Sequence, residues 1–170
     1  MDREKRLEEI YDRHSNALYA FLINFSRDED LTYDTIQEVF QKIAQRPGIL
    51  DKVLNERAFL IRLAHRQAID LIRRHQTAQR YRTQYAEQHA NPFASTLDPD
   101  ESAFRQALAD GLRALPAEQR AVIHLKLWEQ FTFEEIATSL EIPTNTAASR
   151  YRYGIDKLRT LLRPLYNEIQ

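Results

Sequence analysis

Apolar residues recur every three or four positions along most of this chain, which is the spacing of one face of an α-helix. Residues 4–25 keep this spacing over several turns, and residues 33–45 and 56–75 repeat it. The 170 residues include only 3 Gly and 6 Pro, so few positions favour the tight turns that join short strands. No alternating pattern of the β type and no internal repeat is visible in the sequence. These features predict an all-α protein built from amphipathic helices.

A polar segment separates the predicted helices into two groups. Residues 76–100 contain two Pro and lose the helical spacing of apolar residues, which is typical of a linker. Asp98, Pro99 and Glu101 then have the order of a capping box at the start of a helix. We therefore expect two small helical domains and a flexible linker between them, with the ranges 1–82, 83–98 and 99–170. The helices expected in the second domain cover residues 99–114, 116–128, 133–140 and 145–162.

The composition argues against an enzyme. The chain has no Cys, which excludes disulfides, thiolate metal sites and cysteine nucleophiles. Its 5 His lack the spacing of paired metal ligands, and neither a Gly-rich phosphate loop nor a nucleophile elbow is present. We therefore expect no catalytic residue, metal, cofactor or small-molecule substrate.

Apolar runs are short throughout the sequence. None approaches the roughly 20 residues needed to cross a bilayer, and the first residues lack the apolar core of a signal peptide. The sequence therefore predicts a cytoplasmic protein that does not insert into membranes.

The formal net charge is −1, but the charges are unevenly distributed. Segment 57–82 holds seven Arg with Asp70 as its only acidic residue, and segment 150–163 holds five basic residues with Asp156 alone. Basic patches of this kind suit the phosphates of nucleic acid. We expect focused contacts with DNA from two parts of a nearly neutral chain.

Residues 131–154, FTFEEIATSLEIPTNTAASRYRYG, have the pattern of a helix-turn-helix. Thr132 and Glu135 are spaced as a capping box, and Pro143 stops the first helix from continuing. A helix N-terminus rich in Thr, Asn, Ser and Arg suits contacts with phosphates and base edges in a major groove. Taken alone, the segment is also consistent with a helical hairpin whose polar face is only solvated.

The second helix of this motif divides into two faces by its spacing. The apolar face, which we expect to pack on the first helix at Ile136, Ala137 and Leu140, carries Ala147, Tyr151, Ile155 and Leu158. The opposite face carries Asn145, Ala148, Ser149, Arg152 and Asp156.

The helix expected at 56–75 has a basic stripe, formed by Arg62, Arg66 and Arg73, opposite an apolar face. Alone, such a stripe is more often a soluble surface than a DNA site. The polar side of the helix expected at 33–45 is, from its physics alone, an ordinary solvated face. Its members are Asp34, Gln37, Glu38 and Gln41.

Three segments occur in a characteristic order: DTIQEVFQKIA, AFLIRLAHRQAIDLIRR and LPAEQRAVIHLKLWEQFTFEEIATSLEIPTNTAASRYRYGIDKLRTLL. Together they resemble the extracytoplasmic-function (ECF) sigma factors of the RNA polymerase sigma-70 family. The resemblance covers nearly the whole chain apart from the linker. This chain differs from the common family pattern at Thr32-Tyr33, where small residues are usual, and at Gln67, where Asn is common. Ala147-Ala148 replaces Val then Lys, and Gly154 replaces Ala.

The resemblance implies an alternative sigma factor, which binds core RNA polymerase and directs initiation at promoters with −35 and −10 elements. It implies contacts with the β′ clamp helices and the β flap of the polymerase, with promoter DNA and, as in many members, with an anti-sigma factor. The residues matching the polymerase-binding segment are Asp34, Ile36, Gln37, Glu38 and Phe40. Those matching the segment that recognises and opens the −10 element are Arg62, Arg66, Gln67, Asp70, Arg73 and Arg74. Those matching the −35 helix are Thr144, Asn145, Thr146, Ala148, Ser149, Arg150 and Arg152.

Two other classes fit part of the sequence. A helix-turn-helix regulator would bind DNA without docking on polymerase, and would usually dimerise on two half-sites. A helical adaptor that has lost DNA binding is supported only by the small residues Ala147 and Ala148. The segment DTIQEVF and the absence of any ligand-like domain argue against the regulator.

Overall fold

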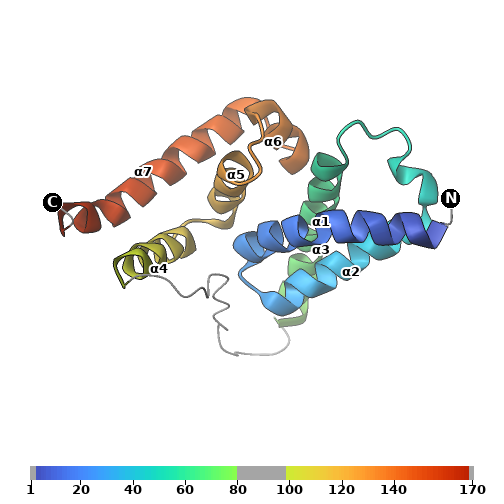
Figure 1. The fold of residues 1–170 in the computed structure, drawn as a ribbon, viewed down its shortest axis with the longest axis horizontal. Helices are drawn as coiled ribbons and strands as arrows, with labels where there is room; N and C mark the ends of the chain where they lie inside the picture. The colour runs from blue at the N-terminus through green and yellow to red at the C-terminus, as the bar shows by residue number, and fades with distance from the viewer. Residues whose placement is uncertain (1–2, 80–98, 169–170) are drawn as a thin grey trace. The chain divides into compact units, whose positions relative to one another are not determined.

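The computed structural model describes residues 3–79 and 99–168, and every regular element within these ranges is helical (Figure 1). The all-α fold is therefore confirmed for the described part of the chain. The elements are α1 (Arg3–Ser26), α2 (Glu29–Gln45), the 3₁₀ turn η1 (Pro47–Leu50), α3 (Glu56–Gln79), α4 (Pro99–Arg113), α5 (Ala117–Leu127), α6 (Phe133–Leu140) and α7 (Thr144–Glu168). The expected linker, 83–98, and the cap Asp98 lie outside the described residues.

These helices form two compact units. In the first unit, α1, α2 and α3 pack on one another, and η1 contacts α2. In the second unit, α7 packs along α4 and α5. No helix in the described ranges is both long and apolar enough to span a membrane.

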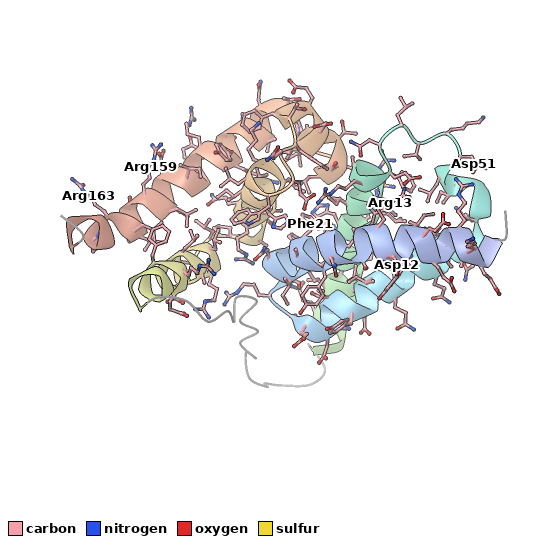
Figure 2. All side chains as sticks on the ribbon, in the orientation of Figure 1. Asp12, Arg13, Phe21, Asp51, Arg159 and Arg163 are labelled. Carbon is pink, nitrogen blue, oxygen red and sulfur yellow. The ribbon has the colours of Figure 1, made fainter. Side chains whose placement is uncertain are left out.

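The first unit has the core that its apolar spacing predicts. Phe21 and Leu22 of α1, Val39 of α2, and Leu60 and Ile61 of α3 are completely buried. Phe21 is labelled on α1 in Figure 2. Burying large apolar side chains from all three helices is the main favourable term in forming the unit.

Helix α2 begins earlier than its apolar spacing predicts. The spacing predicts a helix over 33–45, but α2 starts at Glu29. The Asp28 side chain accepts a hydrogen bond from the backbone N–H of Leu31 at 2.9 Å, which caps the helix. Glu29 and Asp30 lie in the first turn, where the helix dipole favours negative charge. The acidic residues 28–30 therefore mark a helix start.

The second unit is built around a small apolar cluster. Its buried members are Leu112 and Leu115, at the end of α4 and just after it, Ile123 of α5 and Leu158 of α7. Helix α5 ends at Leu127, and the N–H of Trp128 donates to the carbonyl of His124 at 2.9 Å. Helix α7 continues past the expected end at residue 162 to Glu168 and includes Pro164.

Gly154 has a packing role in this unit. It is buried on α7, and a Cβ at this position would lie 2.6 Å from Cδ1 and 3.4 Å from Cγ1 of Ile123. Carbon atoms in contact normally lie about 3.5–4.0 Å apart. The missing side chain therefore allows α7 to approach α5 more closely than an Ala would.

Candidate functional site

The residues predicted to dock on polymerase divide into two kinds on α2. Asp34 and Gln37 are exposed, and Glu38 is half-buried. Ile36 and Phe40 are instead buried, and the Phe40 ring meets the ring of Tyr11 edge-on with centroids 4.9 Å apart. Only the three polar residues can offer a partner their side chains, whereas Ile36 and Phe40 hold α2 against the core.

A polar cluster lies between α2 and α3, and we call it the α2–α3 bracket. It consists of Glu38, Lys42, Gln67 and Arg74. Gln67 Nε2 donates to Glu38 Oε2, Lys42 Nζ donates to Gln67 Oε1, and Arg74 Nη1 lies 3.7 Å from Glu38 Oε1. Gln67 is 1% exposed. The structure thus buries a residue that the resemblance assigns to the promoter, and Gln67 could reach DNA only by breaking these bonds.

The basic stripe of α3 is at the surface, as its spacing predicts. Arg66, Arg73 and Arg74 are exposed, and so is Asp70. Arg62 is half-buried, with its guanidinium carbon 5.3 Å from the centroid of the Phe59 ring. On the opposite side of α3, the apolar residues Leu60, Ala64 and Leu71 are buried. A face of this composition suits contacts with phosphates.

Side chains of α1 hold Asp51 of the connection and Glu56 at the start of α3, a feature that the sequence alone did not indicate. Arg6 Nη1 lies 3.0 Å from Asp51 Oδ1, and both Arg13 Nη1 and His14 Nε2 lie 3.4 Å from Glu56 Oε2. Arg13 and Asp51 mark two of these positions in Figure 2. These pairs join residues more than forty positions apart, so no local sequence pattern could have revealed them.

The connection also fixes the start of α3. The Asn55 side chain accepts from the N–H of Ala58 at 3.0 Å, as a helix cap does. Leu54, just before it, is fully exposed. The connection therefore presents an apolar side chain to solvent from a backbone that is anchored at its end.

In the second unit, the predicted capping box of the helix-turn-helix is confirmed. The N–H of Glu135 donates to Thr132 Oγ1 at 3.1 Å, and the N–H of Thr132 donates to Glu135 Oε2 at 2.8 Å. The turn after α6 places Glu141 at φ 57°, in the left-handed region. The N–H of Ile142 then donates to the carbonyl of Ala137 at 3.0 Å, which closes the turn before α7.

The first turns of α7 present a polar face. Ala147 is completely buried, which confirms its predicted place on the apolar face. Arg152 Cζ lies 5.1 Å from the centroid of the Tyr153 ring, and Ser149 Oγ donates to the carbonyl of Thr146 at 3.1 Å. The exposed members of the predicted −35 set are Thr144, Asn145 and Arg152, and its half-buried members are Thr146, Ala148, Ser149 and Arg150. Further along, Arg159 and Arg163 project away from α7 (Figure 2).

The apolar face of α7 has neighbours beyond those expected. The spacing predicts packing on Ile136, Ala137 and Leu140 of α6. The structure also packs Tyr151, Ile155 and Leu158 in the cluster formed with α4 and α5. Helix α6 contributes a ring contact, with the centroids of Phe133 and Tyr151 5.7 Å apart. The position of the predicted recognition helix therefore depends on α4 and α5.

Nothing in the described residues resembles a metal centre. Within 3–79 and 99–168, no three His, Asp or Glu side chains are grouped so that they could hold a metal ion. The chemistry that these surfaces offer is hydrogen bonding and charge, from the polar face of α2, the basic face of α3 and the first turns of α7.

Two family models match the chain, one in each unit. Residues 10–78 match sigma-70 region 2, and residues 111–160 match sigma-70 region 4. The first match covers most of α1, all of α2 and nearly all of α3, and the second covers α5, α6 and parts of α4 and α7.

Several curated proteins are similar over almost the whole chain. The ECF RNA polymerase sigma factor SigL of Mycobacterium tuberculosis is 31% identical over 160 residues, which are 92% of this chain and 88% of SigL. The ECF RNA polymerase sigma factor SigK of Mycobacterium sp. (strain KMS) is 28% identical over 159 residues, covering 90% and 81% of the two chains. The RNA polymerase sigma factor CarQ of Myxococcus xanthus is 27% identical over 162 residues, covering 95% and 92%.

A solved structure has the same fold. It is the sigma factor RpoE of Bartonella quintana, in a co-crystal with the anti-sigma factor NepR. The match has a TM-score of 0.71 at 22% identity and covers 94% of this chain and 96% of RpoE.

Proposed function

We propose a mechanism for this chain on the premise that it belongs to the ECF RNA polymerase sigma factors of the sigma-70 family. As an alternative sigma factor, it binds core RNA polymerase and directs initiation at promoters. In our proposal it has no catalysis of its own and works in the cytoplasm, where it supplies promoter choice to the polymerase.

The proposal assigns a task to each part of the chain. Residues 1–82 form region 2, which docks on the β′ clamp helices through the polar face of α2 and meets the −10 element with α3. Residues 99–170 form region 4, which meets the −35 element with the start of α7 and the polymerase at the β flap. Residues 83–98 join them. The observation that carries this assignment is that one unit offers a polar α2 face and a basic α3 face within the span matching region 2.

The competing function, a helix-turn-helix regulator that works without docking, is not favoured. Such a protein has no need of a region 2, whereas residues 10–78 of this chain match one. We further propose that an anti-sigma factor controls this chain, because the similar sigma factor RpoE was crystallised with one.

Run-off transcription with core polymerase, with and without the full chain, tests the proposed function. We expect initiation at defined promoters only when the chain is present. A chain that footprints DNA as a dimer and leaves core polymerase unstimulated would establish the regulator instead.

Two variants test the assignment within region 2. Gln37→Ala removes an exposed α2 side chain, so we expect weaker binding to core polymerase and intact opening of promoters once the complex is saturated. Arg73→Ala removes an exposed cation of α3, so we expect intact polymerase binding and slower promoter opening, measured with a fluorescent base in the −10 element. Equal effects of both variants on both measurements would contradict the assignment.

A further inference from the structure

The hydrogen bonds of the α2–α3 bracket run in a defined direction, from Lys42 to Gln67 and from Gln67 to Glu38. Glu38 and Lys42 lie one turn apart on α2, a spacing at which they could pair directly. The amide of Gln67 from α3 stands between them instead. A carboxylate only accepts hydrogen bonds and an ammonium group only donates them, so only one orientation of the amide satisfies both partners. In that orientation the NH₂ group faces Glu38 and the carbonyl faces Lys42.

Burial makes this arrangement costly to disturb. Gln67 is 1% exposed, and a buried amide without hydrogen-bond partners is strongly disfavoured. The side chain of Glu38 is 30% exposed, and its second oxygen lies 3.7 Å from Arg74 Nη1. Gln67 and Arg74 of α3 therefore both contact the carboxylate of Glu38, while part of that side chain remains exposed.

A direct role for Gln67 in reading bases conflicts with this geometry. To face DNA, its amide would have to leave the interior and break both bonds. That movement would remove the α3 donor from Glu38 and the α3 acceptor from Lys42. Both hydrogen bonds involve a charged group, and such bonds are stronger than those between neutral groups, so breaking them would be costly.

We propose that Gln67 and Lys42 are positioning residues for polymerase docking: they fix the carboxylate of Glu38 on the surface of α2, and Gln67 makes no base contact. This inference rests on the proposed function, in which the α2 face meets the polymerase. It moves Gln67 from the −10 set to the docking machinery and adds Lys42, which belongs to none of the predicted site sets.

Exchanging the carboxylate of Glu38 and the amide of Gln67 between α2 and α3 tests the bracket in the free protein. Gln67→Glu places a buried carboxylate against Glu38, so we expect hydrogen exchange of the α2 and α3 amides to become about tenfold faster. The double variant Glu38→Gln with Gln67→Glu restores one amide and one carboxylate, with the donor now on α2. We expect it to recover most of the protection.

The exposed Gln76 of the same helix provides the matched control, because Gln76→Glu makes the same change in charge at the surface. We expect that variant to exchange like the wild type. An equal effect of Gln67→Glu and Gln76→Glu, or strictly additive effects in the double variant, would overturn the bracket. This measurement needs no polymerase, so it stands even if the proposed function fails.

The second test concerns docking. Lys42→Met removes the ammonium group that donates to Gln67. Gln67→Leu replaces the amide with an apolar side chain of similar size that can stay buried. We expect each to weaken binding to core polymerase by about three- to tenfold, the effect of losing one such hydrogen bond. Lys42→Arg, which keeps a donor, should bind nearly as the wild type does.

The same variants are then compared on promoters that carry each single-base change in the −10 element. We expect their order of base preference to equal that of the wild type. A changed order with unchanged polymerase affinity in Gln67→Leu would show that Gln67 reads a base, which would overturn the positioning role. Wild-type chain that fails to bind core polymerase would overturn the proposed function itself.

Discussion

Gly154→Ala should change the stability of the second unit through two opposing effects, a gain in helix propensity and a steric cost. Within a helix, replacing Gly by Ala stabilises by about 1 kcal/mol, because Gly loses more backbone freedom on folding. Here the added methyl would lie 2.6 Å from Cδ1 of Ile123. That side chain is completely buried in the cluster of the second unit, so it has to shift by about 1 Å into occupied space to restore a normal contact. Overpacking of this kind costs about 1–3 kcal/mol.

The steric cost should exceed the gain, so we expect Gly154→Ala to lower the free energy of unfolding of the second unit by about 1 kcal/mol. Trp128 is the single Trp of the chain and caps α5, so its fluorescence during a urea titration reports this unit. The matched control is Gly111→Ala on α4, where the new methyl would meet only leucine side-chain ends, at 3.0 Å from Leu158 Cδ2 and 3.9 Å from Leu161 Cδ1. At 3.0 Å the neighbouring side chain has to shift less than at Gly154, so this variant should be neutral or stabilised.

A double variant isolates the cause. Ile123→Val removes Cδ1, the atom that the new methyl would strike, and alone costs about 0.5–1.5 kcal/mol. Combined with Gly154→Ala, it should be at least as stable as Ile123→Val alone, because the methyl then fills the vacated space. A stabilised Gly154→Ala, or additive losses in the double variant, would refute the close approach of α7 to α5.

Two further predictions concern helix starts and one concerns DNA. Thr132→Ala removes the cap of α6 and should destabilise the second unit by about 1 kcal/mol, followed by Trp128 fluorescence, while Thr132→Ser should retain most of the stability. Asp28→Ala should lower the stability of the first unit by a similar amount, about 1 kcal/mol, measured by hydrogen exchange in α2. Asp28→Asn keeps the acceptor and should lower it less. Equal losses of stability in the two variants would contradict the cap. Arg152→Ala should weaken binding of the polymerase complex to all −35 sequences alike and reduce the salt dependence by about one phosphate contact; a changed base preference would instead indicate base readout.

The helices could be predicted because their signals are local. The spacing of Leu18, Phe21 and Leu22 indicates the buried face of α1, and all three are buried. The capping box at Thr132 and Glu135 lies within four residues, and both of its hydrogen bonds are present. Such features follow from backbone geometry alone, so a single sequence suffices to find them.

The parts that could not be predicted depend on partners that are distant in the sequence. Helical spacing places Gln67 near Arg66 on α3, but only the packing of α2 decides that one is buried and the other exposed. The pairs of Arg6 with Asp51, and of Arg13 and His14 with Glu56 at the start of α3, likewise need the fold to bring them together. The start of α2 at Glu29 was not predicted, because a run of acidic residues is favourable both in loops and in the first turn of a helix.

The structure also explains how a nearly neutral protein can serve as a DNA-binding subunit. Several predicted DNA contacts already have partners within the chain: Arg62 lies over Phe59, Arg74 lies near Glu38, and Arg152 lies over Tyr153. Each of these cations gains less from a phosphate than an unpartnered one would, because a contact within the protein is exchanged for it. Affinity for DNA rises with the number of phosphates neutralised, and each small unit can neutralise only a few. We therefore expect firm binding only when both units engage one promoter together, and a polymerase that holds both of them would raise their effective concentration at the promoter.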